Sequence, residues 1–180
     1  MPTQPVEREN PEPGGVLFGS ATLTRPNSDA EAVTYNPELA PVGAAMTGFV
    51  VPSRDGTTQA YLTVSGLLPN RGYAVHAHTD ACGATGDAAG PHFQNRVDPA
   101  ATPQAESTNP EYANPDNEFW LDLRTDANGA GMSRVTVPFT VTDDRGPRSF
   151  VIHEAEQTST GPGQAGQAGG RVACLTLSEQ

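Results

Sequence analysis

The sequence predicts an all-β protein, an antiparallel sandwich or barrel of eight short strands, and three observations support this. Several segments alternate apolar and polar residues with period two, the pattern of a strand that buries one face. Glycine (19) and proline (17) supply a fifth of the 180 residues, which disfavours long helices. Turn sequences such as PSRDG, LPNRG, DANGAG and DDRGP separate the segments. The chain length suits one domain.

The expected strands occupy the segments with this alternation. In chain order they are residues 15–23, 44–52, 57–67, 72–78, 118–126, 133–141, 148–155 and 170–177. Residues 1–14 are polar and rich in proline and glutamate, so we expect a disordered tail or linker before a domain at 15–180. No run approaches 18 apolar residues, which predicts no membrane span, and the start lacks the apolar run of a signal peptide.

Two connections are too long for hairpin turns, residues 79–117 and residues 156–169. Loops longer than about 15 residues in a compact domain are usually functional or disordered. The first contains Cys82 and His92, so we expect it to be functional. The second, QTSTGPGQAGQAGG, has low complexity, and we expect it to be mobile.

Charge and composition exclude several functions. The net charge is −11 and no basic residues lie in a run, which argues against a nucleic-acid partner. All ten basic residues are arginine. The absence of lysine excludes a Schiff-base lysine, a pyridoxal enzyme and the lysine of a phosphate-binding loop.

The chain has two cysteines, Cys82 and Cys174, far apart in sequence and each beside an expected strand. This pattern fits a disulfide, two buried thiols or a metal-binding pair. A disulfide would imply an oxidising compartment.

The four histidines form the most informative pattern. His76 and His78 are separated by one residue on an expected strand, so both side chains leave the same face and can aim at one point. His92 lies in the long loop, and His153 ends an apolar strand. Taken singly, a histidine at a strand end is usually a hydrogen-bonded surface or core residue. Together they predict a metal site, and imidazole suits copper.

The motifs HAHTDAC, GPHF, FVIHE and GRVAC follow one another along the chain, and in this order they resemble the copper/zinc superoxide dismutase family over roughly residues 15–178. The resemblance implies an eight-stranded antiparallel Greek-key β-barrel or sandwich, immunoglobulin-like, with two long functional loops. It also implies roles for seven residues. One copper would be held by His76, His78, His92 and His153. Cys82 and Cys174 would form a disulfide, and Arg171, beside the copper, would receive the superoxide anion.

The chain departs from the two-metal members of that family. They use further histidines in the long loop to bind zinc, and no histidine lies between His92 and His153 here. Carboxylates are present in this segment, but oxygens with one imidazole make a poor structural zinc site. The chain therefore resembles the copper-only branch, and no zinc is expected. By analogy with that branch, Glu118 would orient the His92 ring, the alternative being a solvated strand-end glutamate. The carboxylates nearest His92 in this segment are Asp98, Glu106, Glu111, Asp116 and Glu118.

The second loop, residues 156–169, lacks the charged residues that focus anions onto copper in the two-metal enzymes. We therefore expect weaker steering and a more exposed copper. The expected function is a superoxide dismutase in which His92 and Arg171 take part in catalysis. The alternative functions are a copper storage or delivery domain and, less consistent with four histidines, a structural domain. We expect a secreted, periplasmic or cell-surface antioxidant protein, and a monomer is favoured.

Overall fold

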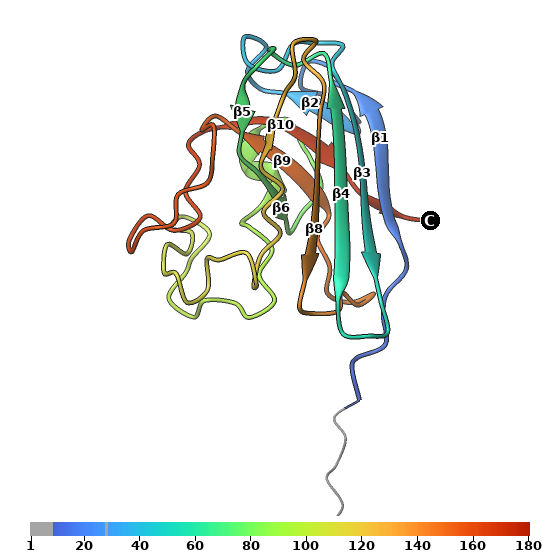
Figure 1. Cartoon of the computed structure of the whole chain (residues 1–180), viewed down its shortest axis with the longest axis vertical. Coiled ribbons are helices and arrows are strands. Elements are labelled where there is room, and N and C mark those ends of the chain that lie inside the picture. Colours follow the sequence, from blue (N-terminus) through green and yellow to red (C-terminus); the bar gives the residue numbers. More distant parts are fainter. Residues whose placement is uncertain (1–8, 28) are drawn as a thin grey trace, which may run out of the picture.

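The computed structural model describes residues 9–27 and 29–180, and within them the chain is a β-sandwich (Figure 1). The first sheet has five strands in the order β11-β1-β3-β4-β8, and every neighbouring pair is antiparallel. These strands are β1 (Leu17–Thr22), β3 (Ala45–Pro52), β4 (Thr58–Ser65), β8 (Gly131–Val137) and β11 (Ser178–Glu179).

The second sheet lies behind the first and has four antiparallel strands in the order β2-β10-β9-β6 (Figure 1). A short two-stranded pair, β5 with β7, and one 3₁₀ helix, η1, complete the elements. Their bounds are β2 Ala32–Thr34, β5 Gly72–Tyr73, β6 Val75–His78, η1 Gly86–Ala89, β7 Leu123–Arg124, β9 Ser149–His153 and β10 Arg171–Thr176.

The core fills the space between the two sheets. Leu62 on β4, Phe150 on β9 and Leu175 on β10 are fully buried. A Cβ atom at residue 48 would lie 2.6 Å from the Phe150 ring, so Gly48 lets that ring pack directly on β3. Burying each large apolar side chain contributes about 1.5–3 kcal/mol, which makes this layer the main stabilising element.

The predicted fold class is confirmed, with differences in individual strands. The structure adds β2, β11 and the short helix η1, which are too brief for a periodic pattern to reveal. The strand expected at 118–126 is paired only at β7 and at single bridges that join Trp120 to His76 and Glu118 to Gln94. The strand expected at 133–141 ends at Val137, since Pro138 has no N–H to donate to the ladder.

Residues 1–8 of the predicted tail lie outside the described residues, and residues 9–14 form no strand. The first backbone hydrogen bond of the sheet region joins the Gly14 N–H to the Val141 carbonyl. Among the described residues, no helix has the length and apolar character needed to cross a membrane.

A disulfide between Cys82 and Cys174 ties the long loop after β6 to β10, as the family resemblance implied. β10 also carries Arg171, whose Cα partner on β9 is His153. The register shifts between Arg171 and Ala173. The second sheet and the loop after β6 therefore carry these residues, with His78 opposite Ser149 at the start of β9 and Arg171 opposite His153 at its end.

Candidate metal centre

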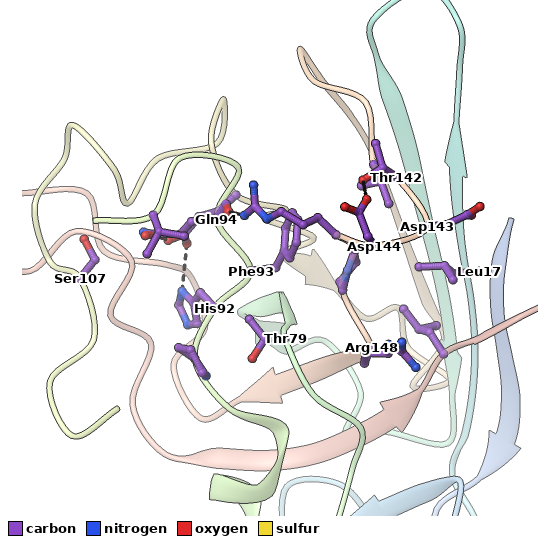
Figure 2. Close-up of a pocket in the computed structure, with 18 of the residues that line it drawn as sticks. Leu17, Thr79, His92, Phe93, Gln94, Ser107, Thr142, Asp143, Asp144 and Arg148 are labelled. Atoms are coloured by element: carbon purple, nitrogen blue, oxygen red, sulfur yellow. Dashed lines mark hydrogen bonds and ion pairs between the residues drawn. The ribbon is translucent and has the colours of Figure 1, made fainter. Parts of the chain in front are cut away.

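A groove with a volume of 470 Å³ runs between the long loop, the turn before β9 and the start of β1. Figure 2 shows His92 at one side of this groove, with Leu17 and Asp143 on the opposite side. Glu106 and Glu118 also line it, whereas the other three histidines do not. The groove therefore reaches the histidines from the His92 side.

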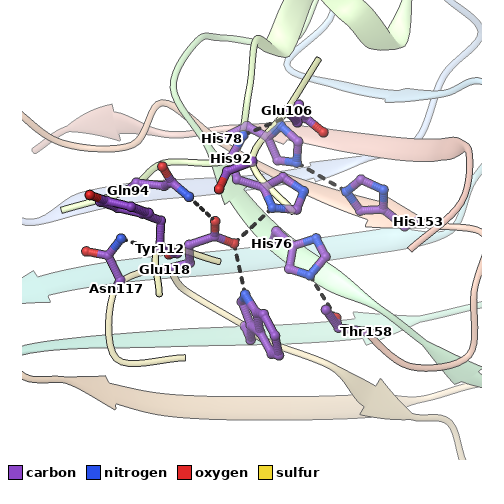
Figure 3. A network of polar contacts seen from close by, with 12 residues as sticks. His76, His78, His92, Gln94, Glu106, Tyr112, Asn117, Glu118, His153 and Thr158 are labelled. Atoms are coloured by element: carbon purple, nitrogen blue, oxygen red, sulfur yellow. Dashed lines mark hydrogen bonds and ion pairs between the residues drawn. The ribbon is translucent and has the colours of Figure 1, made fainter. Parts of the chain in front are cut away.

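The four histidines lie together at the His92 side of this groove (Figure 3). His76 and His78 project from β6, His153 ends β9, and a single antiparallel bridge to His78 holds His92 beside them. One ring nitrogen from each histidine lies within 4.8 Å of the others. The rings of His76 and His153, far apart in sequence, thus lie close together because β6 and β9 are paired neighbours.

Backbone carbonyls fix two of the rings. Nδ1 of His78 donates to the Gly90 carbonyl at 2.9 Å, and Nδ1 of His153 donates to the Gly169 carbonyl at 3.4 Å. Both rings then present Nε2 to the cluster, where the two Nε2 atoms are 3.1 Å apart. A carbonyl partner on one nitrogen sets the tautomer that leaves the other nitrogen free to ligate.

Side chains fix the other two rings. Nε2 of His76 contacts the Thr158 hydroxyl at 2.7 Å, and Nδ1 of His92 lies 2.9 Å from a Glu118 carboxylate oxygen. The remaining nitrogens are Nδ1 of His76 and Nε2 of His92. Each of the four histidines therefore has one nitrogen held by the protein and one available.

The available nitrogens fit a metal ion. Nδ1 of His76 is buried and has no hydrogen-bond partner among the described residues, although buried polar atoms are normally paired. An ion between the rings would satisfy this atom and separate His78 from His153. The donor set consists of four imidazole nitrogens, which suit copper or zinc and which Cu(II) binds most tightly in the divalent series.

Burial keeps these rings neutral. It lowers the pKa of His76 and His78 well below 6.5 and lowers that of His153 to about 3. The Arg171 guanidinium acts in the same direction on all three pKa values, because its positive charge disfavours a second cation nearby. Neutral imidazole is the form that binds metal, so the site is ready for an ion at neutral pH.

Glu118 is the centre of a buried polar network (Figure 3). Only 1% of the residue is exposed, and its carboxylate accepts hydrogen bonds from His92, from Gln94 at 2.8 Å and from Trp120 at 2.9 Å. The residue that we expected beside His92 thus lies in contact with it, and three donors stabilise the buried charge.

Thr158 and Asp122 form a support for His76 that the sequence analysis missed. The Thr158 hydroxyl donates to Asp122 at 2.8 Å, and the Thr158 N–H donates to the other carboxylate oxygen at 2.7 Å. The sequence offered one signal for Asp122. A period-two pattern places Glu118, Trp120 and Asp122 on one face of the segment, so Asp122 could have been expected near the site. Nothing in the low-complexity loop singled out Thr158.

The loop at 156–169 folds over the site instead of leaving it open. Thr158 is 8% exposed, and backbone hydrogen bonds between Ser159 and both Gly166 and Gln167 close the loop on itself. His76 and His78 are fully buried as a result. Ala165 and Ala168 of the loop are buried despite its lack of charge, and the exposure of a bound copper stays a prediction.

Arg171 lies beside the cluster but is already paired. Its guanidinium donates to the Gly86 carbonyl at 2.9 Å and to a Glu106 carboxylate oxygen at 3.0 Å. Its side chain is 17% exposed, compared with 36% for that of Glu106. The predicted anion-receiving arginine therefore has a carboxylate of this chain as its partner.

Comparisons with known proteins identify the fold and the family of this chain. No curated protein sequence matches the chain. The crystal structure of the clock protein EA4 superposes with a TM-score of 0.51 at 16% identity, covering 93% of this chain and 96% of that one, which shows a shared fold. The sequence profile of copper/zinc superoxide dismutase (SODC) matches residues 46–176. The chain therefore belongs to the copper/zinc superoxide dismutase family.

Proposed function

We propose that this protein is a copper-only superoxide dismutase, which converts superoxide to dioxygen and hydrogen peroxide. The observation that carries the proposal is the four-imidazole cluster, in which each ring has one nitrogen held by the protein and one available. When bound, copper would supply one-electron chemistry by alternating between Cu(II) and Cu(I). His76, His78, His92 and His153 would hold it.

The protein uses one copper and no zinc in this proposal. All four histidines of the chain belong to the cluster, and Glu118 occupies the second nitrogen of His92. The carboxylate thereby orients the ring so that Nε2 faces the other histidines. His92 is the one imidazole of the four that lines the groove, so we assign its Nε2 proton transfer at times when that nitrogen does not hold copper.

Arg171 receives the anion in this proposal. The net charge of −11 repels superoxide at long range, so attraction must come from a local positive charge. The position of Arg171 across from His153 in the sheet supports this role. Its role supports an enzyme, since a copper carrier has no need of an anion-receiving group.

The disulfide is consistent with a secreted, periplasmic or cell-surface location, since disulfides persist in oxidising compartments. We propose that the protein acts there as a monomer, with superoxide as its small-molecule partner.

A copper storage or delivery domain is the second candidate function. The ion pair between Arg171 and Glu106 favours it, because a neutralised arginine attracts anions less strongly.

Copper titration and a superoxide assay separate these functions. The purified protein is loaded with Cu(II), its metals are counted, and its paramagnetic resonance spectrum is recorded to count nitrogen ligands. We expect one copper, four nitrogens and dismutase activity that a chelator abolishes. Tight copper binding without activity would select the carrier, and no copper binding would exclude both functions.

A further inference from the structure

Glu106 joins two parts of the candidate site through one atom. Its Oε1 accepts a hydrogen bond from the Arg171 guanidinium at 3.0 Å and another from the His92 backbone N–H at 3.2 Å. The proposed anion-receiving arginine and a proposed copper ligand therefore share a carboxylate. Figure 3 shows Glu106 near His92.

The turn that carries Glu106 is held in place on both sides. Thr102 and Ala105 exchange two backbone hydrogen bonds, and the Ser107 hydroxyl donates to Asp98 at 2.6 Å. Hydrogen bonds on both sides of Glu106 thus fix the backbone of the turn that holds its carboxylate near Arg171. Glu106 also lines the groove that leads to His92, so an anion arriving there meets this carboxylate.

We propose that Glu106 competes with incoming anions for Arg171 and so determines the anion affinity of the site. An anion near Arg171 must either displace the carboxylate or bind beside a negative charge. This inference rests on the proposed function for the role of Arg171. It adds a residue that restrains anion binding, where the sequence analysis expected only residues that promote it.

The first test uses metal-free protein and the arginine reagent phenylglyoxal, with the modified residues identified by mass spectrometry. Glu106→Ala removes the partner of Arg171, and we expect the rate of Arg171 modification to rise at least about threefold, as loss of a partly exposed ion pair allows. An unchanged rate would overturn the proposal.

The control variant is Glu111→Gln, in the same loop. Its carboxylate lies 3.8 Å from Arg96 and contacts no residue of the site among those described, so Arg171 modification should be unchanged. Arg145 reports on the loop itself, because it donates to the Asn95 and Gln94 carbonyls. If Arg145 also becomes reactive in Glu106→Ala, the loop has opened, and Glu106→Gln then replaces that variant in the comparison.

The second test titrates copper-loaded protein with azide, a small monoanion, and follows its binding by absorbance. We expect Glu106→Gln to bind azide about three- to fivefold more tightly than the unchanged protein, and Glu111→Gln to leave the affinity unchanged. Equal affinities in all three proteins would refute the role of Glu106.

The two proposals fail in different ways. A copper-loaded protein without dismutase activity whose azide affinity still rises in Glu106→Gln would remove the enzyme but keep the competition at Arg171. An active dismutase with unchanged azide affinity and unchanged Arg171 labelling would keep the enzyme and remove the role of Glu106.

Discussion

An oxygen of the Glu118 carboxylate lies 2.9 Å from Nδ1 of His92, in a position where Glu118 is only 1% exposed. A buried carboxylate without partners would be costly, but Gln94 and Trp120 also donate to this one. The contact fixes which nitrogen of His92 faces the other histidines.

Replacing Glu118 by glutamine should weaken copper binding about tenfold. The amide is a poorer acceptor than the carboxylate, and it brings a second N–H toward the one that Gln94 donates. Competition with a chelator of known copper affinity measures the change. Glu111→Gln is the matched control, and an affinity equal to that of the unchanged protein would remove the orienting role of Glu118.

Replacing Thr158 by valine should weaken copper binding by a similar factor of about ten. The substitution keeps the shape but removes the hydroxyl that links His76 to Asp122, so the His76 ring loses its orientation. Serine at this position should restore affinity. Ser159→Ala, next in sequence, should have no effect because no side-chain hydrogen bond of Ser159 is seen among the described residues.

Replacing Arg171 by alanine should slow superoxide turnover about tenfold or more while leaving copper affinity within twofold of the unchanged protein. The guanidinium contacts Gly86 and Glu106 and none of the four histidine rings by hydrogen bonding, so its loss removes positive charge without removing a ligand. Pulse radiolysis measures the rate. Turnover that does not change would exclude an anion-receiving role.

Replacing both cysteines by serine should reduce the free energy of unfolding by about 2–5 kcal/mol. The disulfide joins residues 92 apart, and in the chain-entropy model closing a loop of this size restricts the unfolded chain strongly. Urea unfolding of the metal-free protein measures the difference. Identical midpoints for the variant and the disulfide-bonded protein would show that the bridge adds no stability.

The metal-free protein should lose stability as the pH falls below about 6.5. The pKa values of His76, His78 and His153 are lowered in the folded state, so the unfolded chain binds more protons in this range and stability rises with pH. For His153 the loss should continue toward pH 3. Urea midpoints measured across this range test the slope, which His153→Gln should reduce.

Most of the candidate site could be predicted from the sequence. The His-x-His pattern on β6 and the ordered motifs that carry His92 and His153 are local features that can be read without a structure. The partner of Arg171 was not predictable in this way. Glu106 lies 65 residues from Arg171 in the chain, and nothing in the sequence distinguishes it from the other carboxylates of the loop. Thr158 was hidden for a similar reason, since its contact with Asp122 depends on how a low-complexity loop packs. Strand positions were more predictable because burial alternates along β4 and its neighbours.

The four imidazoles come from positions spread between residues 76 and 153, so an unfolded chain does not hold them around one ion. Any metal that binds only the assembled cluster shifts the folding equilibrium by mass action, and at one hundred times its dissociation constant it adds about 2.7 kcal/mol to the native state. The melting temperature of this protein is therefore also a measure of metal occupancy, and it should depend on the concentration of free ion.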